Sequence, residues 1–214
     1  MEVMDPDYYK VWWQAHIDGY DTKELLYSIG PDQMASKKIL VNSLPLDEIK
    51  KFQKLKIEIW GGWFGYPLID LLLEKVPNIH RITNIDVDEK ALALCKRYTN
   101  VKGLSKIVDY KCQSVMDPIE GHEDTRLVIN TSSEHMPNLE QIVKNKDYKA
   151  NCIFALQSNN MFHVAGQHIN CVNNSTELRE QSGLDTVWTE LSYEMKNGYE
   201  RYMVIGKKVD GRIV

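Results

Sequence analysis

From residue 57 onward, short apolar runs alternate with amphipathic stretches along the chain. Apolar and β-branched runs of strand length predict strands at 57–60, 80–85, 107–114, 126–130 and 151–157. Hydrophobic residues at helical spacing predict helices between these strands, at 67–75, 89–98 and 139–143. Strands that alternate with helices in this way predict a parallel sheet whose crossover connections are right-handed.

The end of the chain follows a different pattern. Residues 176–181 are typical of a helix, and the runs at 187–193 and 200–207 are typical of strands. The sequence KNG at 196–198 lies between the two runs and favours a tight turn. We therefore expect the sheet to finish with an antiparallel hairpin.

The N-terminal segment is helical in pattern and rich in aromatic residues. Its hydrophobic residues from 8 to 46 recur at helical spacing, with a break at Gly30-Pro31. We expect a helical extension over 1–55, followed by one compact α/β domain over 56–214. Packing on the sheet explains the aromatic side chains better than a lid that closes on a ligand; they are Tyr8, Tyr9, Trp12 and Trp13.

Length and charge narrow the function classes. The chain has 214 residues, with 26 Lys and Arg against 30 Asp and Glu, so the formal net charge of −4 offers no global basic field for nucleic acid or an anionic membrane. A local basic groove stays open as an alternative. No apolar stretch approaches the length of a membrane span, and four dispersed cysteines predict reduced thiols. We expect a cytoplasmic protein.

A glycine-rich loop follows the first predicted strand. Gly61, Gly62 and Gly65 lie between that strand and a helix, where a nucleotide-binding loop needs a sharp turn and a close approach of the backbone to its ligand. Asp86 ends the second strand, 21 residues after Gly65, the spacing typical of a carboxylate that holds ribose hydroxyls. The alternative role of Asp86 is a helix N-cap, for which Asp88 is better placed.

Several segments in order resemble one family. The class I S-adenosylmethionine-dependent methyltransferases are similar to this chain over residues 56–208. The resemblance implies a Rossmann-like fold with a mostly parallel seven-stranded sheet and an antiparallel C-terminal hairpin. It also implies S-adenosyl-L-methionine as the cofactor. The segments that carry it are IEIWGGWFG, ITNIDVDEKALALCKRY, VDYKCQSVMD, LVINTSSEHM and NCIFALQSNN.

The resemblance assigns residues to the cofactor. It places Gly61, Gly62 and Gly65 under the methionine half, and Asp86 at the ribose. Ser114 follows the third strand, where the family contacts adenine. Gln33, Ser36 and Lys37 lie just before the core domain, in the region where family members often complete the cofactor site.

The first motif of the family begins with an acid, and this chain departs from it. Either Glu58 is that acid and the glycine loop is altered, or Trp60 occupies the place of the acid and Glu58 points elsewhere. Both residues are therefore candidates for cofactor contact.

The segment after the fourth strand faces the sulfonium and the acceptor in the family. Here it begins at Asn130 and contains Glu134 and His135. His135 is the natural general base, and Glu134 would orient it or bind the acceptor. The alternative is that the pair only opens the helix before Pro137. The segment lacks Asn-Pro-Pro-Tyr and Pro-Cys sequences, which argues against methylation of exocyclic base nitrogens or of cytosine C5.

The sequence thus predicts a methyltransferase for a small-molecule or nucleotide-containing acceptor, with no metal in its site. One alternative is a non-catalytic or regulatory binding protein on the same scaffold, which the altered glycine loop favours. Another is a transferase that uses the same cofactor differently. A third is a metal-dependent RNA 2′-O-methyltransferase, with Glu134, His135 and either His168 or His163 as ligands. That family has a further glutamate where this chain has Thr131.

Overall fold

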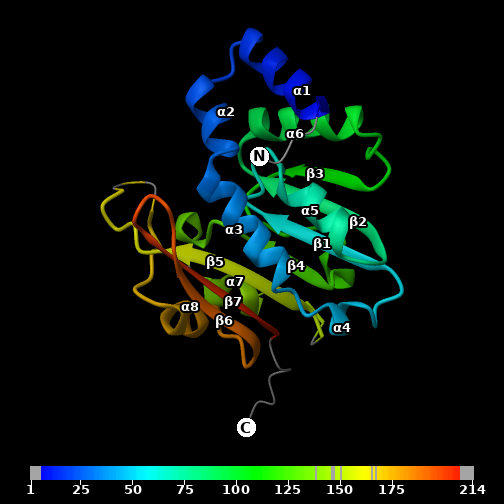
Figure 1. Cartoon of the computed structure of the whole chain (residues 1–214). Coiled ribbons are helices and arrows are strands. Elements are labelled where there is room, and N and C mark those ends of the chain that lie inside the picture. Colours follow the sequence, from blue (N-terminus) through cyan, green and yellow to red (C-terminus); the bar gives the residue numbers. More distant parts are fainter. Residues whose placement is uncertain are drawn as a thin grey trace.

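A seven-stranded sheet with helices on both faces forms the body of the protein (Figure 1). The computed structural model describes residues 6–137, 139–145, 148–149, 151–164, 166 and 168–207. The strands are β1 (Leu55–Trp60), β2 (Ile79–Asp86), β3 (Val108–Cys112), β4 (Leu127–Asn130), β5 (Ile153–Asn159), β6 (Thr186–Glu194) and β7 (Glu200–Lys207).

Helices connect and precede these strands. The α-helices are α1 (Pro6–Ile17), α2 (Thr22–Ser28), α3 (Pro31–Asn42), α4 (Leu46–Ile49), α5 (Leu68–Lys75), α6 (Glu89–Val101), α7 (Leu139–Asn145) and α8 (Ser175–Ser182). Two single turns of 3₁₀-helix are η1 (His122–Asp124) and η2 (Ser133–His135). Among the described residues, none of these helices combines the length and the apolar character that a bilayer crossing requires.

The strand order is β3-β2-β1-β4-β5-β7-β6, with β1 to β5 parallel to one another. Strand β7 runs antiparallel to both β5 and β6. These pairings confirm the predicted parallel sheet and its antiparallel hairpin. Strands β2 and β3 follow β1 toward one edge of the sheet, whereas β4 and β5 lie on the other side of β1, so the strand order reverses between β1 and β4. Ligands of open α/β sheets bind outside the carboxyl ends of the strands at such a point.

Two predicted strands differ from the structure by two residues at their C-terminal ends. The third strand was expected to reach residue 114 but ends at Cys112, because Ser114 enters a turn in which its Oγ accepts a hydrogen bond from the Met116 amide. The fifth strand extends to Asn159 rather than residue 157, because β7 supplies backbone partners along its whole length, up to the pair Asn159–Arg201.

The sheet is buried on both faces, as expected for parallel strands covered by helices. Alternation along β1 sends Ile57 and Ile59 into the cluster beneath α3 and α5. Trp60 points to the other face, where it packs in a second cluster with Phe154 and the side chains of α7 and α8. Both faces of β1 are therefore hydrophobic core.

The expected packing of the N-terminal aromatic residues on the sheet is wrong, because α1 packs on α6 instead. Helix α3 packs on α5. Tyr8 and Trp12 of α1 are buried in a third cluster with Tyr66 and Tyr98, and the Trp12 indole donates a hydrogen bond to Ser28 Oγ at 3.1 Å. Their neighbours Tyr9 and Trp13 belong to the opposite side of the helix and are 58% and 67% exposed. The break expected at Gly30-Pro31 lies where α2 gives way to α3.

This arrangement predicts unequal effects for the two adjacent tryptophans. Trp12→Ala should lower the free energy of unfolding by about 3–5 kcal/mol, because it removes a buried aromatic side chain. Trp13→Ala serves as the matched control and should change it by less than about 0.5 kcal/mol. Urea unfolding followed by circular dichroism measures both. Equal losses in the two variants would contradict the packing of α1.

Candidate functional site

A cavity of about 970 Å³ opens at the carboxyl edge of the sheet. The segments that follow β1 to β5 line it, together with residues of α2, α3 and β7. It therefore lies at the point where the order of the strands reverses, the expected place for a ligand.

The glycine loop forms one end of the cavity. Gly61 and Gly62 line it, and the Gly61 amide donates a hydrogen bond to the Ile85 carbonyl at 2.8 Å. A Cβ on Gly62 would lie only 1.8 Å from Asn84 Oδ1, so the loop accepts no side chain at this position. Asn84 in turn donates to the Trp63 carbonyl at 3.1 Å and holds the loop against β2.

Asp86 lies at the end of β2 and lines the same end of the cavity. Its carboxylate accepts hydrogen bonds from the amides of Trp63, at 2.7 Å, and Asp88, at 3.0 Å. Asp88 caps α6 through the Ala91 amide at 3.0 Å, as the sequence favoured. Asp86 is thus free of the capping role and held rigidly beside the glycine loop.

Ser114 also lines the cavity, next to Gln113 and Val115 in the loop after β3. Its hydroxyl accepts the hydrogen bond from the Met116 amide at 3.1 Å. The structure therefore brings together four of the predicted cofactor residues: Gly61, Gly62, Asp86 and Ser114.

Glu58 and Trp60 lie outside the cavity lining. Residues two apart on a strand share a face, so both side chains point into the second core cluster. The Glu58 carboxylate accepts hydrogen bonds from Thr125 Oγ1 at 2.8 Å and Tyr148 Oη at 2.5 Å, and the Trp60 indole lies 3.3 Å from it. The structure therefore places neither side chain in the cavity lining, although both were candidates for cofactor contact.

Gly65 and Asn130 also lie outside the lining, and each has a structural task. Gly65 has φ +72°, and a Cβ there would come within 2.5 Å of Cys95 Sγ on α6. Asn130 is fully buried, and its amide donates to the Trp60 carbonyl at 3.1 Å. Its Oδ1 accepts from the Ser132 amide at 3.0 Å. Asn130 thereby shapes the turn that leaves β4.

Glu134 and His135 are carried by that turn, the 3₁₀ segment η2, and both line the other end of the cavity. Glu134 is buried, and its Oε1 accepts a hydrogen bond from Asn159 Nδ2 at 2.8 Å. The same oxygen lies 3.5 Å from Arg201 Nη1. The carboxylate thus has Asn159 and Arg201 beside it, and the orientation of His135 by Glu134 stays a prediction.

Two buried cations lie on the wall near Glu134. Arg201 of β7 lines the cavity and donates to the Thr131 carbonyl. Lys37 of α3 also lines it and donates to Gln33 Oε1. Burial, with Arg201 nearby, lowers the pKa of Lys37 to about 7, and the Glu134 charge opposes this. Sequence analysis missed Arg201, because an arginine at the start of a strand looks like any surface cation until the partner strands are known.

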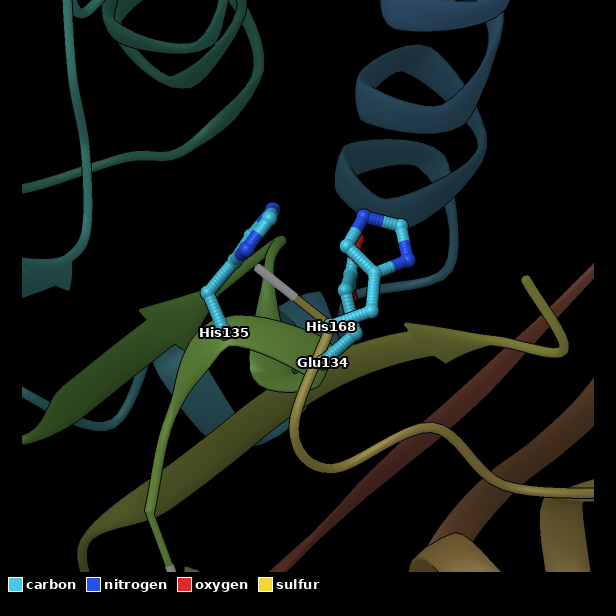
Figure 2. A group of neighbouring side chains, drawn as sticks. All are labelled: Glu134, His135 and His168. Carbon is cyan, nitrogen blue, oxygen red and sulfur yellow. The ribbon is translucent and has the colours of Figure 1, made fainter. Parts of the chain in front are cut away.

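His168, in the segment after β5, approaches the same place. Its ring centroid lies 4.7 Å from that of His135, at an interplanar angle of 82°. Burial lowers the pKa of His168, with the Glu134 charge opposing. One ligand atom each from Glu134, His135 and His168 lie within 4.8 Å of one another, a grouping able to hold a metal ion (Figure 2). His163, the other sequence candidate, is exposed and outside this group.

Comparison with known proteins gives matches to solved structures. No family model and no curated protein matches the sequence. The [4+2]-cyclase SpnF has 12% identity and a TM-score of 0.67, over 96% of this chain and 94% of its own. A Galdieria sulphuraria protein described as a sarcosine dimethylglycine methyltransferase has 10% identity and a TM-score of 0.65, over 96% and 99%. Geranyl diphosphate methyltransferase in complex with SAM has 8% identity and a TM-score of 0.61, over 83% and 86%.

Identities this low speak for the fold alone. The strand order, the antiparallel hairpin and these neighbours agree on one architecture. The chain has the Rossmann-like fold of the class I S-adenosylmethionine-dependent methyltransferases.

Proposed function

We propose that the protein is an S-adenosylmethionine-dependent methyltransferase acting on a small-molecule or nucleotide-containing acceptor. One observation carries this proposal. A single cavity has the glycine loop and Asp86 at one end and a cluster of polar side chains, Glu134 and His135 among them, at the other. Cofactor and acceptor can therefore meet within one cavity.

The cofactor end fits the group that the fold implies. Two amides and the tight packing of Gly62 fix the loop, and the Asp86 carboxylate stands ready to accept hydrogen bonds from a pair of ribose hydroxyls. Ser114 and Val115 line the part of the wall beyond Asp86, where an adenine would lie. The cavity is at the upper end of the roughly 300–1,000 Å³ typical of ligand sites, which leaves room for an acceptor.

The acceptor end supplies positioning and proton transfer. S-adenosylmethionine supplies a methyl group on a sulfonium, and the chain has to align a nucleophile with it. Side chains of this end that can accept a proton from the nucleophile include the imidazole of His135 and the ε-amino group of Lys37, whose pKa of about 7 suits such a role.

The packing of Trp60 bears on the non-catalytic alternative. That alternative drew on an altered glycine loop, with a tryptophan in place of a small residue. Trp60 is fully buried in the core, and Gly61 and Gly62 still line the cavity. We therefore favour the enzyme over a binding or regulatory protein.

Cofactor binding should depend on Asp86. Asp86→Asn should weaken the binding of S-adenosylhomocysteine by about 10- to 100-fold, because hydrogen bonds to a charged acceptor contribute about 1.5–3 kcal/mol. Isothermal titration calorimetry measures this, and Asp109→Asn, which changes a half-exposed carboxylate of β3 outside the cavity, should leave the affinity unchanged. Unaltered affinity in Asp86→Asn would contradict the proposal that Asp86 binds the ribose hydroxyls. The absence of saturable binding to the unaltered protein would contradict the proposed function.

Lys37 should make stability depend on pH. Its pKa falls from 10.5 in the unfolded chain to about 7 in the folded protein, so between these values the unfolded chain holds the extra proton. The contribution of Lys37 to the free energy of unfolding should therefore rise with pH across this window, by up to about 1.4 kcal/mol per pH unit, and be lowest below pH 7. Urea titrations at several pH values should show this slope reduced in Lys37→Met. Lys51→Met, at an exposed lysine, should keep it; equal slopes in the two variants would argue against a neutral buried Lys37.

A further inference from the structure

The side chains of Glu134, His135 and His168 converge at the acceptor end of the cavity, although they come from two segments far apart in sequence (Figure 2). Glu134 and His135 follow β4 in η2, and His168 follows β5. Backbone hydrogen bonds fasten the two segments together, because the Glu134 carbonyl accepts from the amides of Ile169 at 2.9 Å and Asn170 at 3.0 Å. The relative position of Glu134 and His168 is thus fixed by the fold.

We propose that Glu134, His135 and His168 bind a divalent first-row transition-metal cation, with its remaining coordination positions open to the cavity. The cation site itself is independent of the proposed function. Its role, to hold an oxygen atom of the acceptor, rests on that function.

The donor set selects the class of cation. One carboxylate oxygen with two imidazole nitrogens suits Zn²⁺, Co²⁺ and similar ions, whereas Mg²⁺ and Ca²⁺ prefer oxygen ligands throughout. A cation about 2.1 Å from each ligand needs ligand atoms roughly 3–4 Å apart. The ligand atoms here lie within 4.8 Å of one another, so the three side chains have to move slightly closer when a cation binds.

The carboxylate of Glu134 offers an oxygen for this purpose. Its Oε1 already accepts from Asn159 and lies near Arg201. Its Oε2 is buried, and among the described residues it has no hydrogen-bond partner. A buried carboxylate oxygen without a partner is costly, and a cation would satisfy it. The Arg201 guanidinium, 3.5 Å from Oε1, holds the other side of the carboxylate and does not reach the unpartnered oxygen.

His168 is oriented as metal-bound histidines commonly are. Its Nδ1 lies 3.2 Å from the Met161 carbonyl. An Nδ1–H donated to that carbonyl leaves Nε2 with a free lone pair, the arrangement in which a backbone oxygen fixes the tautomer of a ligand histidine. Asn159 supports Glu134 in the same way, by a hydrogen bond at 2.8 Å. Two of the three ligands therefore have supporting groups in place.

Three protein ligands leave coordination positions open, as in catalytic rather than structural metal sites. These positions face the cavity, where an oxygen-bearing acceptor, such as one with a hydroxyl group, would complete the coordination next to the methyl donor. With a cation bound, His135 acts as a ligand and not as a general base.

Cobalt titration of the full chain without a histidine tag tests the site. Co²⁺, followed by visible absorption and calorimetry, should bind with one ion per chain, and Zn²⁺ should displace it while excess Mg²⁺ should not. His135→Ala and His168→Ala should each weaken binding by at least about 10-fold, as loss of a ligand should cost no less than loss of a supporting group. His163→Ala removes an exposed histidine of the same segment and should leave the affinity unchanged.

The outcomes separate this inference from the proposed function. Glu134→Gln should also weaken Co²⁺ binding. Circular dichroism serves as the control that each variant is folded. Binding that is equal in the unaltered protein, His135→Ala and His168→Ala would overturn the site, as would equal losses in His163→Ala and His168→Ala. S-adenosylhomocysteine binding without Co²⁺ binding would overturn the cation site alone. Co²⁺ binding that follows the expected order of variants would support it even where S-adenosylhomocysteine fails to bind.

Discussion

The hydrogen bonds of the Asn130 side chain join the ends of β1 and β4, and both ends of the cavity depend on this junction. The amide donates to the Trp60 carbonyl at the last residue of β1, directly before the glycine loop. The amide oxygen accepts from the Ser132 amide and the Ser133 hydroxyl, which begin the turn that carries Glu134 and His135. One fully buried side chain thus sets the distance between the cofactor end and the acceptor end.

Burial of the sheet on both faces explains why the polar groups gather at its edge. Helices cover each face, so a charged side chain within the sheet needs partners, as Glu58 finds in Thr125 and Tyr148. At the carboxyl edge, side chains of neighbouring strands meet the cavity instead. There one oxygen of the Glu134 carboxylate lies near buried Arg201, and the other has no hydrogen-bond partner among the described residues. Lys37 adds a second cation. The acceptor end is therefore polar, and its charged groups are not fully paired with one another. This suits a site for a charged or metal-held ligand.

The sequence alone predicted the order of the helices and strands, because hydrophobic periodicity and turn residues are local signals. It predicted the parallel strands, the terminal hairpin and the approach of Gly61, Gly62 and Asp86, since a loop and the end of the next strand are neighbours in any such sheet. It misplaced Glu58 and Trp60, because a strand buried on both faces has no polar side from which its orientation can be told.

Other features of the site depend on long-range contacts that the sequence does not reveal. The choice between His168 and His163 depends on how the segment after β5 docks on η2, through backbone bonds that no pattern reveals. Arg201 enters the site because β7 is inserted next to β5, opposite Asn159. Lys37, which the family resemblance placed near the site, lines the cavity from α3. These placements follow from tertiary packing, which determines the acceptor end more than the cofactor end.

A crystal structure of the protein grown with S-adenosylhomocysteine tests the central claim most directly, namely that one cavity serves cofactor and acceptor. We expect the ribose hydroxyls within hydrogen-bond distance of Asp86, the amino-acid part over Gly61 and Gly62, and the sulfur directed toward Glu134 and His135. A ligand bound elsewhere, or with its sulfur turned away from the acceptor end, would contradict the account.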